Sequence, residues 1–583
     1  MKPVAIILLT LSTYVLLAVY SGSAAPDRLH YVTTAHQAGP VGFRDPIGAI
    51  SPDGAWLAYI SNRHLYLHRI EGSITSELLP DDNTKTGLVW LPDSRHFALQ
   101  EVAFASPATW FQYDIDTGRR ESFSSNLSQL AWSPDERSIA GIASTDKGNE
   151  LWVGRPDGTG GRSFPSAARI ASPVWTTDSQ MVACMTTSQD LQRIMLPCGA
   201  ANAKPLSGSS KAWGTFAFSP DYHTLYYSVA NLEGTLDLWS RDLTSGEATQ
   251  LTHFDRDTYA PSVTRNGDVL FKTQVFRAFL GVTPAEGGAT RVVTTFTSET
   301  PTWSPDGAMI GFTFGNWRRV VDDARYPDIA QDLGIIPFDQ KMVAAKPARI
   351  FQASNSEDQG MSWSPNGKWI AFHSHRDRAD DIFLQRADGA DSPRQITKGG
   401  TETGWPRWSP NGRWIAYSSY PGSNIRATRS KLYVLGIDQD TGVITQASAP
   451  VAIDGFAGNV DQPSWMPDSA HLVFDSNGAA PGRRTLQTVE RTGGRPRKII
   501  DYGSDQVYSG ISVSPDGKWV AYVGLAADGT YQIFRVPASG GTSQQMTLDT
   551  ANKTQPAFSP DGKWLAFTIW QYDVQFWLMK PQK

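Results

Sequence analysis

The chain has 583 residues, of which 40% are hydrophobic, 11% aromatic and 19% charged, and it contains 51 Gly, 37 Pro and 20 Trp. This composition is typical of a folded, turn-rich β protein and excludes an intrinsically disordered chain, and the length predicts two domains. Because 52 basic and 57 acidic residues give a net charge of −5 with no basic stripe or tail, we expect no nucleic-acid partner.

Residues 1–25 have the three parts of a secretory signal peptide. Lys2 is followed by an apolar run from Val4 to Tyr20 and then by small residues up to Ala25. We expect cleavage after Ala24 or Ala25, which places the mature protein in the periplasm or outside the cell. An uncleaved membrane anchor is the alternative, because about 17 apolar residues lie at the lower limit for a spanning helix. The membrane is an expected partner only in that second case.

Twelve copies of one short motif fill the rest of the chain. The clearest copies run from Trp363 to Phe372 and from Phe558 to Phe567, and both read aromatic, Ser-Pro, Asp or Asn, Gly-Lys-Trp, apolar, Ala-Phe. Most copies are 40 to 48 residues apart, which is the spacing of a repeat architecture. The motifs begin at Ser51, Leu91, Ser133, Thr176, Ser219, Thr264, Ser304, Ser364, Ser409, Met466, Ser514 and Ser559.

Each motif predicts a tight turn between two antiparallel strands. Pro presets φ, the Asp or Asn side chain closes the turn by a hydrogen bond, and Gly takes the positive φ. Short segments rich in Trp, Ile, Val, Phe and Tyr flank the turn, as buried strands require. A third strand, such as 381–384, and a fourth, such as 394–397, complete each unit. Four antiparallel strands repeated radially make a propeller blade.

These repeats resemble TolB-type, WD-like propeller repeats over essentially the whole mature chain. They also resemble the propeller of prolyl oligopeptidase-family peptidases, but no G-x-S-x-G pentapeptide and no residues for a hydrolase domain are present. The resemblance implies an all-β fold and a role with envelope proteins, since TolB-type proteins act with outer-membrane lipoproteins and inner-membrane partners. It implies no single activity, because propellers host binding proteins, lyases, hydrolases and accessory domains of peptidases.

TolB-like rings have six blades, so the resemblance implies two tandem six-bladed β-propellers of four-stranded antiparallel blades. We expect the first propeller at residues 26–287 and the second at 288–583, with seven plus five blades as the alternative. We further expect each ring to begin with an outermost strand, at 28–34 and 290–296, and to end with its own third strand. If the segment 290–296 stays instead with the sixth unit, the N-terminal strand must complete the last unit of the chain.

Binding residues are expected on the face that carries the loops between second and third strands, because insertions collect there in units seven to nine. A charged surface around the central opening of the second propeller would bind a peptide segment or an anionic ligand. The plainer interpretation is that these side chains form solvated surface pairs. The predicted binding residues are Arg318, Arg319, Arg325, Tyr326, Arg376, Arg378, Asp381, Arg426 and Arg429.

His373 and His375 alternate on one strand, so both point to the same face and are weak candidates for a metal site without an identifiable third ligand. We therefore predict no metal and no cofactor. Cys184 and Cys198 are the only cysteines, and the sequence allows either a disulfide or two buried thiols.

We expect a non-enzymatic exported scaffold that binds a protein or an envelope component, because H-E-x-x-H, P-loop and G-x-G-x-x-G motifs are also absent from the sequence. The competing hypothesis is a propeller lyase or hydrolase that acts on a polysaccharide or a peptide in the central channel. Whether the protein is an enzyme stays open at this point.

Overall fold

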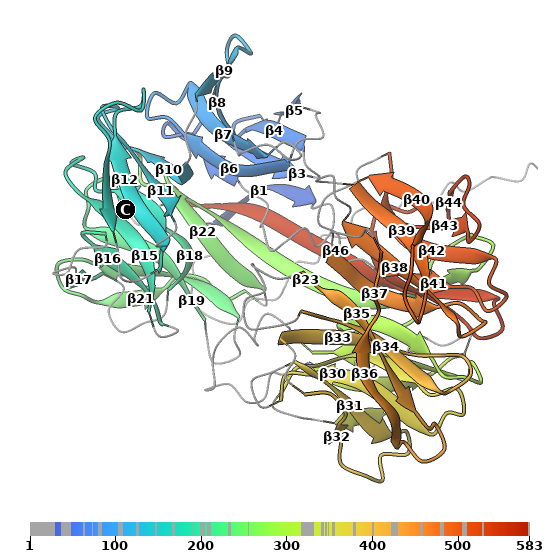
Figure 1. Cartoon of the computed structure of the whole chain (residues 1–583). Coiled ribbons are helices and arrows are strands. Elements are labelled where there is room, and N and C mark those ends of the chain that lie inside the picture. Colours follow the sequence, from blue (N-terminus) through green and yellow to red (C-terminus); the bar gives the residue numbers. More distant parts are fainter. Residues whose placement is uncertain are drawn as a thin grey trace, which may run out of the picture.

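In the computed structural model, the chain forms small antiparallel β-sheets in two groups (Figure 1). Every named element of the described residues is a strand, which confirms the all-β prediction. The structure describes residues 29–580 except for 37–47, 62–63, 73, 80–83, 103–108, 124–126, 146–147, 166–168, 189–190, 199–203, 207–211, 231–234, 255, 316–330, 340–342, 344–346, 348, 353–355, 377–379, 399–400, 421–428, 455–458, 478–482, 504–509 and 528–529.

Ten of the sheets have four strands each, joined in chain order. Five of them belong to the first half of the chain: β2 (Gly48–Ile50), β3 (Trp56–Ser61), β4 (His64–Arg69), β5 (Ile74–Leu79); β6 (Thr84–Trp90), β7 (His96–Val102), β8 (Thr109–Asp114), β9 (Arg120–Phe123); β10 (Leu127–Trp132), β11 (Ile139–Thr145), β12 (Gly148–Gly154), β13 (Arg162–Pro165); β14 (Arg169–Trp175), β15 (Val182–Ser188), β16 (Leu191–Leu196), β17 (Lys204–Pro205); β18 (Trp213–Phe218), β19 (Thr224–Ala230), β20 (Leu236–Asp242), β21 (Ala248–Gln250).

The other five belong to the second half: β25 (Ser298–Trp303), β26 (Met309–Phe314), β27 (Asp332–Pro337), β28 (Arg349–Gln352); β29 (Asp358–Trp363), β30 (Trp369–Ser374), β31 (Asp381–Arg386), β32 (Arg394–Gln395); β33 (Thr401–Trp408), β34 (Trp414–Tyr420), β35 (Lys431–Ile437), β36 (Ile444–Pro450); β37 (Asn459–Trp465), β38 (His471–Asn477), β39 (Arg483–Glu490), β40 (Arg497–Gly503); β41 (Ser512–Val513), β42 (Trp519–Leu525), β43 (Tyr531–Pro537), β44 (Gln544–Gln545).

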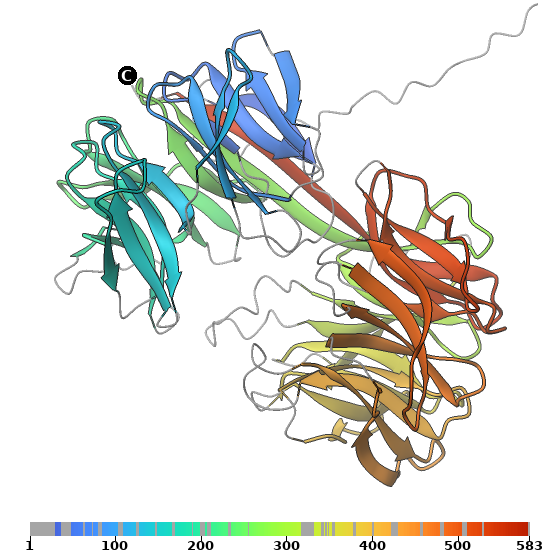
Figure 2. The ribbon, with the colours of Figure 1, turned by 45° about the horizontal axis from the view of Figure 1, so that its top comes forward.

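The eleventh sheet has six strands and joins the two groups (Figure 2). Its centre is a ribbon of two antiparallel 16-residue strands, β23 (Val269–Pro284) and β46 (Trp564–Met579), which pair along their whole length. At one end of the ribbon β22 (Asp257–Val263) pairs with β23, and β1 (Leu29–His36) pairs with β46. At the other end β45 (Asn552–Phe558) pairs with β46, and β24 (Arg291–Val292) pairs with β23. Each end of the ribbon is therefore a four-stranded unit.

The innermost strands of the twelve units contact one another in two closed circuits. The first circuit runs through β2, β6, β10, β14, β18 and β22 and returns to β2. The second circuit runs through β25, β29, β33, β37, β41 and β45 and returns to β25. The last unit of each circuit takes its third strand from the half of the chain that builds the other circuit.

The expectation that each ring ends with its own third strand is thus wrong. The outermost strands lie where the sequence places them, because β1 completes the last unit of the first circuit and β24 completes that of the second. Only the two third strands are exchanged between the circuits. The physical reason is that β23 has no turn residue between Val269 and Leu280, so it continues instead of folding back. β46 likewise runs on without Gly or Pro.

The predicted turn chemistry is confirmed. In the first motif Ser51 Oγ donates to Asp53 Oδ1 (2.5 Å) and accepts from the backbone N–H of Trp56 (2.9 Å), while the Gly54 N–H bonds to the Ser51 carbonyl (2.8 Å). Gly54 has φ of +79°. Five looser copies place a non-glycine residue at the same left-handed position, among them Ser94 and Glu136. The turn geometry therefore persists where the glycine does not.

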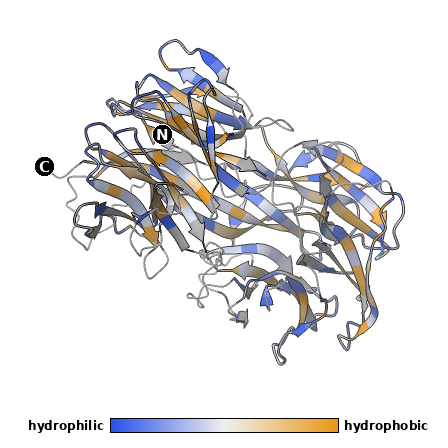
Figure 3. Ribbon diagram, turned by 60° about the vertical axis from the view of Figure 1, so that its left-hand side comes forward, coloured by the Kyte–Doolittle hydropathy of each residue, from blue (hydrophilic) through white to orange (hydrophobic). Residues whose placement is uncertain are grey.

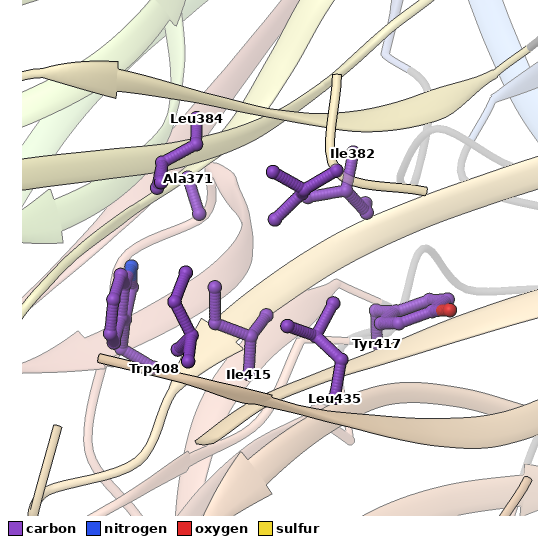
Figure 4. Packing of buried hydrophobic residues seen from close by; sticks show 9 residues of the cluster. Ala371, Ile382, Leu384, Trp408, Ile415, Tyr417 and Leu435 are labelled. Atoms are coloured by element: carbon purple, nitrogen blue, oxygen red, sulfur yellow. The ribbon is translucent and has the colours of Figure 1, made fainter. Parts of the chain in front are cut away.

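Hydrophobic clusters lie between neighbouring units. In the cluster of Figure 4, Ala371, Ile382 and Leu384 of one unit face Trp408, Ile415, Tyr417 and Leu435 of the next. The indole of Trp303 donates to the Ala557 carbonyl (3.0 Å), which links the first and last units of the second circuit. Strands in both circuits carry hydrophobic residues (Figure 3). Because a single unit cannot bury both of its apolar faces, the stacking of neighbours stabilises the fold.

Cys184 on β15 and Cys198 beyond β16 form a disulfide and are 0% and 5% exposed. The structure thereby decides between the two possibilities that the sequence allowed. Within residues 29–580 as described, no helix is long and apolar enough to cross a membrane.

Candidate functional site

We call the ends of the second-circuit units that carry the loops between second and third strands the loop end. At this end, the first residues of the innermost strand pair with the last residues of the second strand of the same unit. Asp358 pairs with Ser374, and Ser298 pairs with Phe314. Of the predicted binding residues, Arg376, Asp381 and Arg429 are described. The others fall outside the described residues: Arg318, Arg319, Arg325, Tyr326, Arg378 and Arg426.

Asp381 lies inside its unit, not on the surface. It is 2% exposed, and its carboxylate accepts hydrogen bonds from Gln395 Nε2 (2.9 Å) and Thr397 Oγ1 (2.8 Å). Asp237 is held in the same way by Gln250 and Thr252. The repeated arrangement ties the third strand to the fourth, so the expectation of a surface ligand does not fit Asp381.

Arg376 is also engaged within the protein. Its Nη2 donates to Asp358 Oδ2 (2.8 Å) and its Nε to Ser374 Oγ (3.0 Å), and its guanidinium lies over the Phe383 ring at 5.3 Å. The side chain of Asp358 is completely buried and that of Arg376 is 20% exposed. This is a buried ion pair and not the solvated pair that we considered. Arg429, by contrast, is exposed.

His373 and His375 do not converge. His373 Nδ1 accepts a long hydrogen bond from the Trp405 N–H (3.5 Å), whereas His375 Nδ1 lies 2.9 Å from Asp380 Oδ1. No group of three His, Cys, Asp or Glu side chains in the described part of the chain is arranged to hold a metal ion.

A β-bulge at the start of the innermost strands shapes the loop end. It places Thr300, Gly360, Trp405, Gln462 and Gln555 at φ between +40° and +65°. Such a bulge redirects the side chains on either side of it. Our sequence analysis missed these residues, although each lies four positions before the first residue of a turn motif.

The bulges bring polar and aromatic groups together from successive units. Gln359 Nε2 donates to Gln331 Oε1, the rings of His373 and Trp405 lie 5.3 Å apart, and the Gly360 backbone packs against His373. Burial lowers the pKa of His373 to about 4; Asp380 opposes this shift and Arg407 adds to it. At neutral pH His373 is therefore an uncharged hydrogen-bond acceptor.

Glu299, on the first innermost strand of this circuit, is partly exposed, but its carboxyl oxygen Oε1 is buried. Its Oε1 has no hydrogen-bond partner among the described residues, and burial raises its pKa to about 8. The group therefore keeps its proton at neutral pH and can donate a hydrogen bond.

Glu299→Gln is expected to stabilise the protein increasingly as pH rises. The unfolded carboxyl loses its proton near pH 4.5 but the folded one only near 8, so the stability of the wild type falls between these values. An amide does not ionise and escapes this loss. Thermal melting from pH 4.5 to 9 should show equal stability of the two proteins at the acid end, a growing advantage of the variant up to pH 8, and a constant difference above. A pH-independent difference would contradict the assignment.

Residues 393–581 match the family model described as the TolB beta propeller domain. This segment of the chain is therefore similar to a TolB beta propeller domain. The matched residues begin before β32 and end beyond β46. They therefore belong to the second circuit, except for the C-terminal half of β46, which pairs with β1 in the first circuit.

Similar proteins include an uncharacterized protein of Agrobacterium fabrum, 27% identical over 205 residues. That match spans 35% of this chain and 63% of the relative, which is less than two thirds of its length. A putative TolB from Agrobacterium tumefaciens has 15% identity and a TM-score of 0.21, with 70% of this chain and 94% of that chain covered. The GH74 enzyme of Niastella koreensis has 12% identity and a TM-score of 0.34, with 89% and 94% covered. These two similarities carry no information on the activity of the TolB-type propeller.

Proposed function

We propose that this chain is an exported scaffold of two six-bladed propellers, at residues 26–287 and 288–583, that share the ribbon of β23 and β46. Its second propeller binds a protein or envelope component through the loop end. The innermost strands form two closed circuits of six strands each. This supports a division into six plus six blades over one into seven plus five. The disulfide between Cys184 and Cys198 supports export, because disulfides form and persist in oxidising compartments.

One observation carries the binding role: successive bulges hold Gln359, His373 and Trp405 together at the loop end. Trp405 is partly exposed and its backbone is fixed by the bulge, so little side-chain entropy is lost when a partner covers it. Tryptophans in such settings are typical centres of protein interfaces. The amide and the neutral imidazole supply hydrogen bonds without a charge to desolvate.

Site-directed photo-cross-linking tests this proposal. A photoreactive amino acid replaces either Arg429, exposed at the loop end, or Arg413, exposed in the turn at the opposite end of the same unit. With the mature protein and an envelope fraction of the source cells, we expect a specific adduct from position 429 and none from 413. Trp405→Ala should reduce the adduct at least tenfold, whereas Trp414→Ala, in the same unit near Arg413, should not. Equal adducts from both positions, or an adduct insensitive to Trp405→Ala, would refute binding at the loop end.

A further inference from the structure

Arg407 occupies a position at which every other unit has a small side chain. It lies on β33, two residues before the first residue of its turn motif. Its equivalents are Ala49, Val89, Ala131, Val174, Ala217, Ser262, Thr302, Ser362, Ser464, Ser512 and Ala557. At Ser362, Ser464 and Ser512 the hydroxyl accepts a backbone N–H of the next unit, as Ser362 Oγ does from Trp408 (3.0 Å). A guanidinium is therefore not needed to build a unit at this position.

The charge of Arg407 is not compensated by a carboxylate. Its Nη1 donates to the carbonyl of Pro406 (3.1 Å), and no described carboxylate forms an ion pair with it. Burial is what lowers the pKa of Arg407, to about 10, so the side chain still carries its charge at neutral pH. A guanidinium has five N–H donors, and a partly buried cation without an anion is costly to desolvate.

The surroundings of Arg407 identify where a ligand would enter. Arg407 is partly exposed and lies on an innermost strand of the second circuit, two residues beyond Trp405. Its charge reaches His373, whose pKa it helps to lower. Arg407 therefore lies two residues along the innermost strand from Trp405, whose ring contacts that of His373.

We propose that Arg407 binds the carboxylate of a ligand at the centre of the second circuit. The planar guanidinium matches a carboxylate in a bidentate manner, and a single cation balances a monoanion better than a phosphate dianion. The ligand lies against Trp405, and the Nε2–H of the neutral His373 donates a hydrogen bond to it. The proposal deepens the binding role of the same propeller and rests on it. The carboxylate belongs either to the C-terminus of a peptide or to a small organic acid.

Calorimetric titration of the mature protein tests this site with four probes: tri-alanine, tri-alanine amide, acetate and inorganic phosphate. We expect tri-alanine or acetate to bind and the amide to bind at least tenfold more weakly than tri-alanine. Tighter binding of tri-alanine than of acetate assigns the site to a peptide terminus, and equal binding assigns it to a small acid. Equal binding of acid and amide, a preference for phosphate, or no binding of any probe would overturn the proposal.

Two variants separate a ligand site from a structural role. Arg407→Ser introduces the residue found at four equivalent positions and should abolish carboxylate binding without lowering the melting temperature. Arg413→Ser, on the exposed turn of the same unit, should leave binding unchanged. A melting temperature lowered by Arg407→Ser, or carboxylate binding that survives it, would contradict the assignment. Cross-linking at position 429 reports separately on the proposed partner, so loss of one result does not imply loss of the other.

Discussion

Deleting residues 574–583 is expected to unfold the first circuit, although these residues lie at the opposite end of the chain from it. The deletion removes the half of β46 that pairs with both β1 and β23. It also removes Val574, Phe576, Leu578 and Met579, which are 0–6% exposed. Burial of such side chains contributes about 1.5–3 kcal/mol each, about 6–12 kcal/mol in total. This is comparable to the whole stability of a typical domain, about 5–15 kcal/mol.

Limited proteolysis with mass spectrometry measures this effect. Cleavage sites in residues 48–263 should become accessible, while those in residues 298–558 stay protected for longer. The matched control deletes residues 580–583 only and loses the ion pair between Lys580 and Asp268, which is worth less than about 1 kcal/mol at the surface. Cleavage confined to the second half of the chain would show that the ribbon is not shared in solution.

Arg376→Ala is expected to destabilise the protein by about 3–5 kcal/mol, because it leaves the fully buried carboxylate of Asp358 without its cation. The loss should appear as a lower urea midpoint for the transition of the second circuit. It should not appear as a selective loss of ligand binding, which the sequence-based role of Arg376 would require.

The control for this prediction is Arg429→Ala, an exposed arginine of the next unit, which should change stability by less than about 0.5 kcal/mol. The double variant Asp358→Ala with Arg376→Ala should lose much less than the sum of the two single variants, because no charge is then left buried. Additive losses would mean that the pair is not coupled.

The repeating unit could be predicted from its turn chemistry, because Pro, Asp and Gly each dictate one feature of the backbone. The exchange of third strands could not be predicted from the motif copies, since it depends on a segment in which no turn occurs. The information was present in the 16-residue stretch from Val269 to Pro284, which is twice the length of most other strands. Motif counting overlooks such a stretch because it contains no motif.

The candidate site was harder to predict than the fold. Charged loop residues suggested a binding surface, yet Arg376 and Asp381 have partners inside the protein. The informative residues lie on the innermost strands, at fixed offsets from the turn motif: Trp405 four positions before it and Arg407 two. Comparing equivalent positions across the twelve units would have identified Arg407, since it is the single large charged residue in a column of small ones.

The shared ribbon also has a consequence for the order of events in the cell. Because ribosomes release the chain from its N-terminus, the first half leaves the ribosome without the strand that completes its last sheet. That half cannot reach its native state until residues 573–579 have been synthesised. The last sheet of the first circuit therefore forms only after the second half of the chain has been made, which couples the folding of the two circuits.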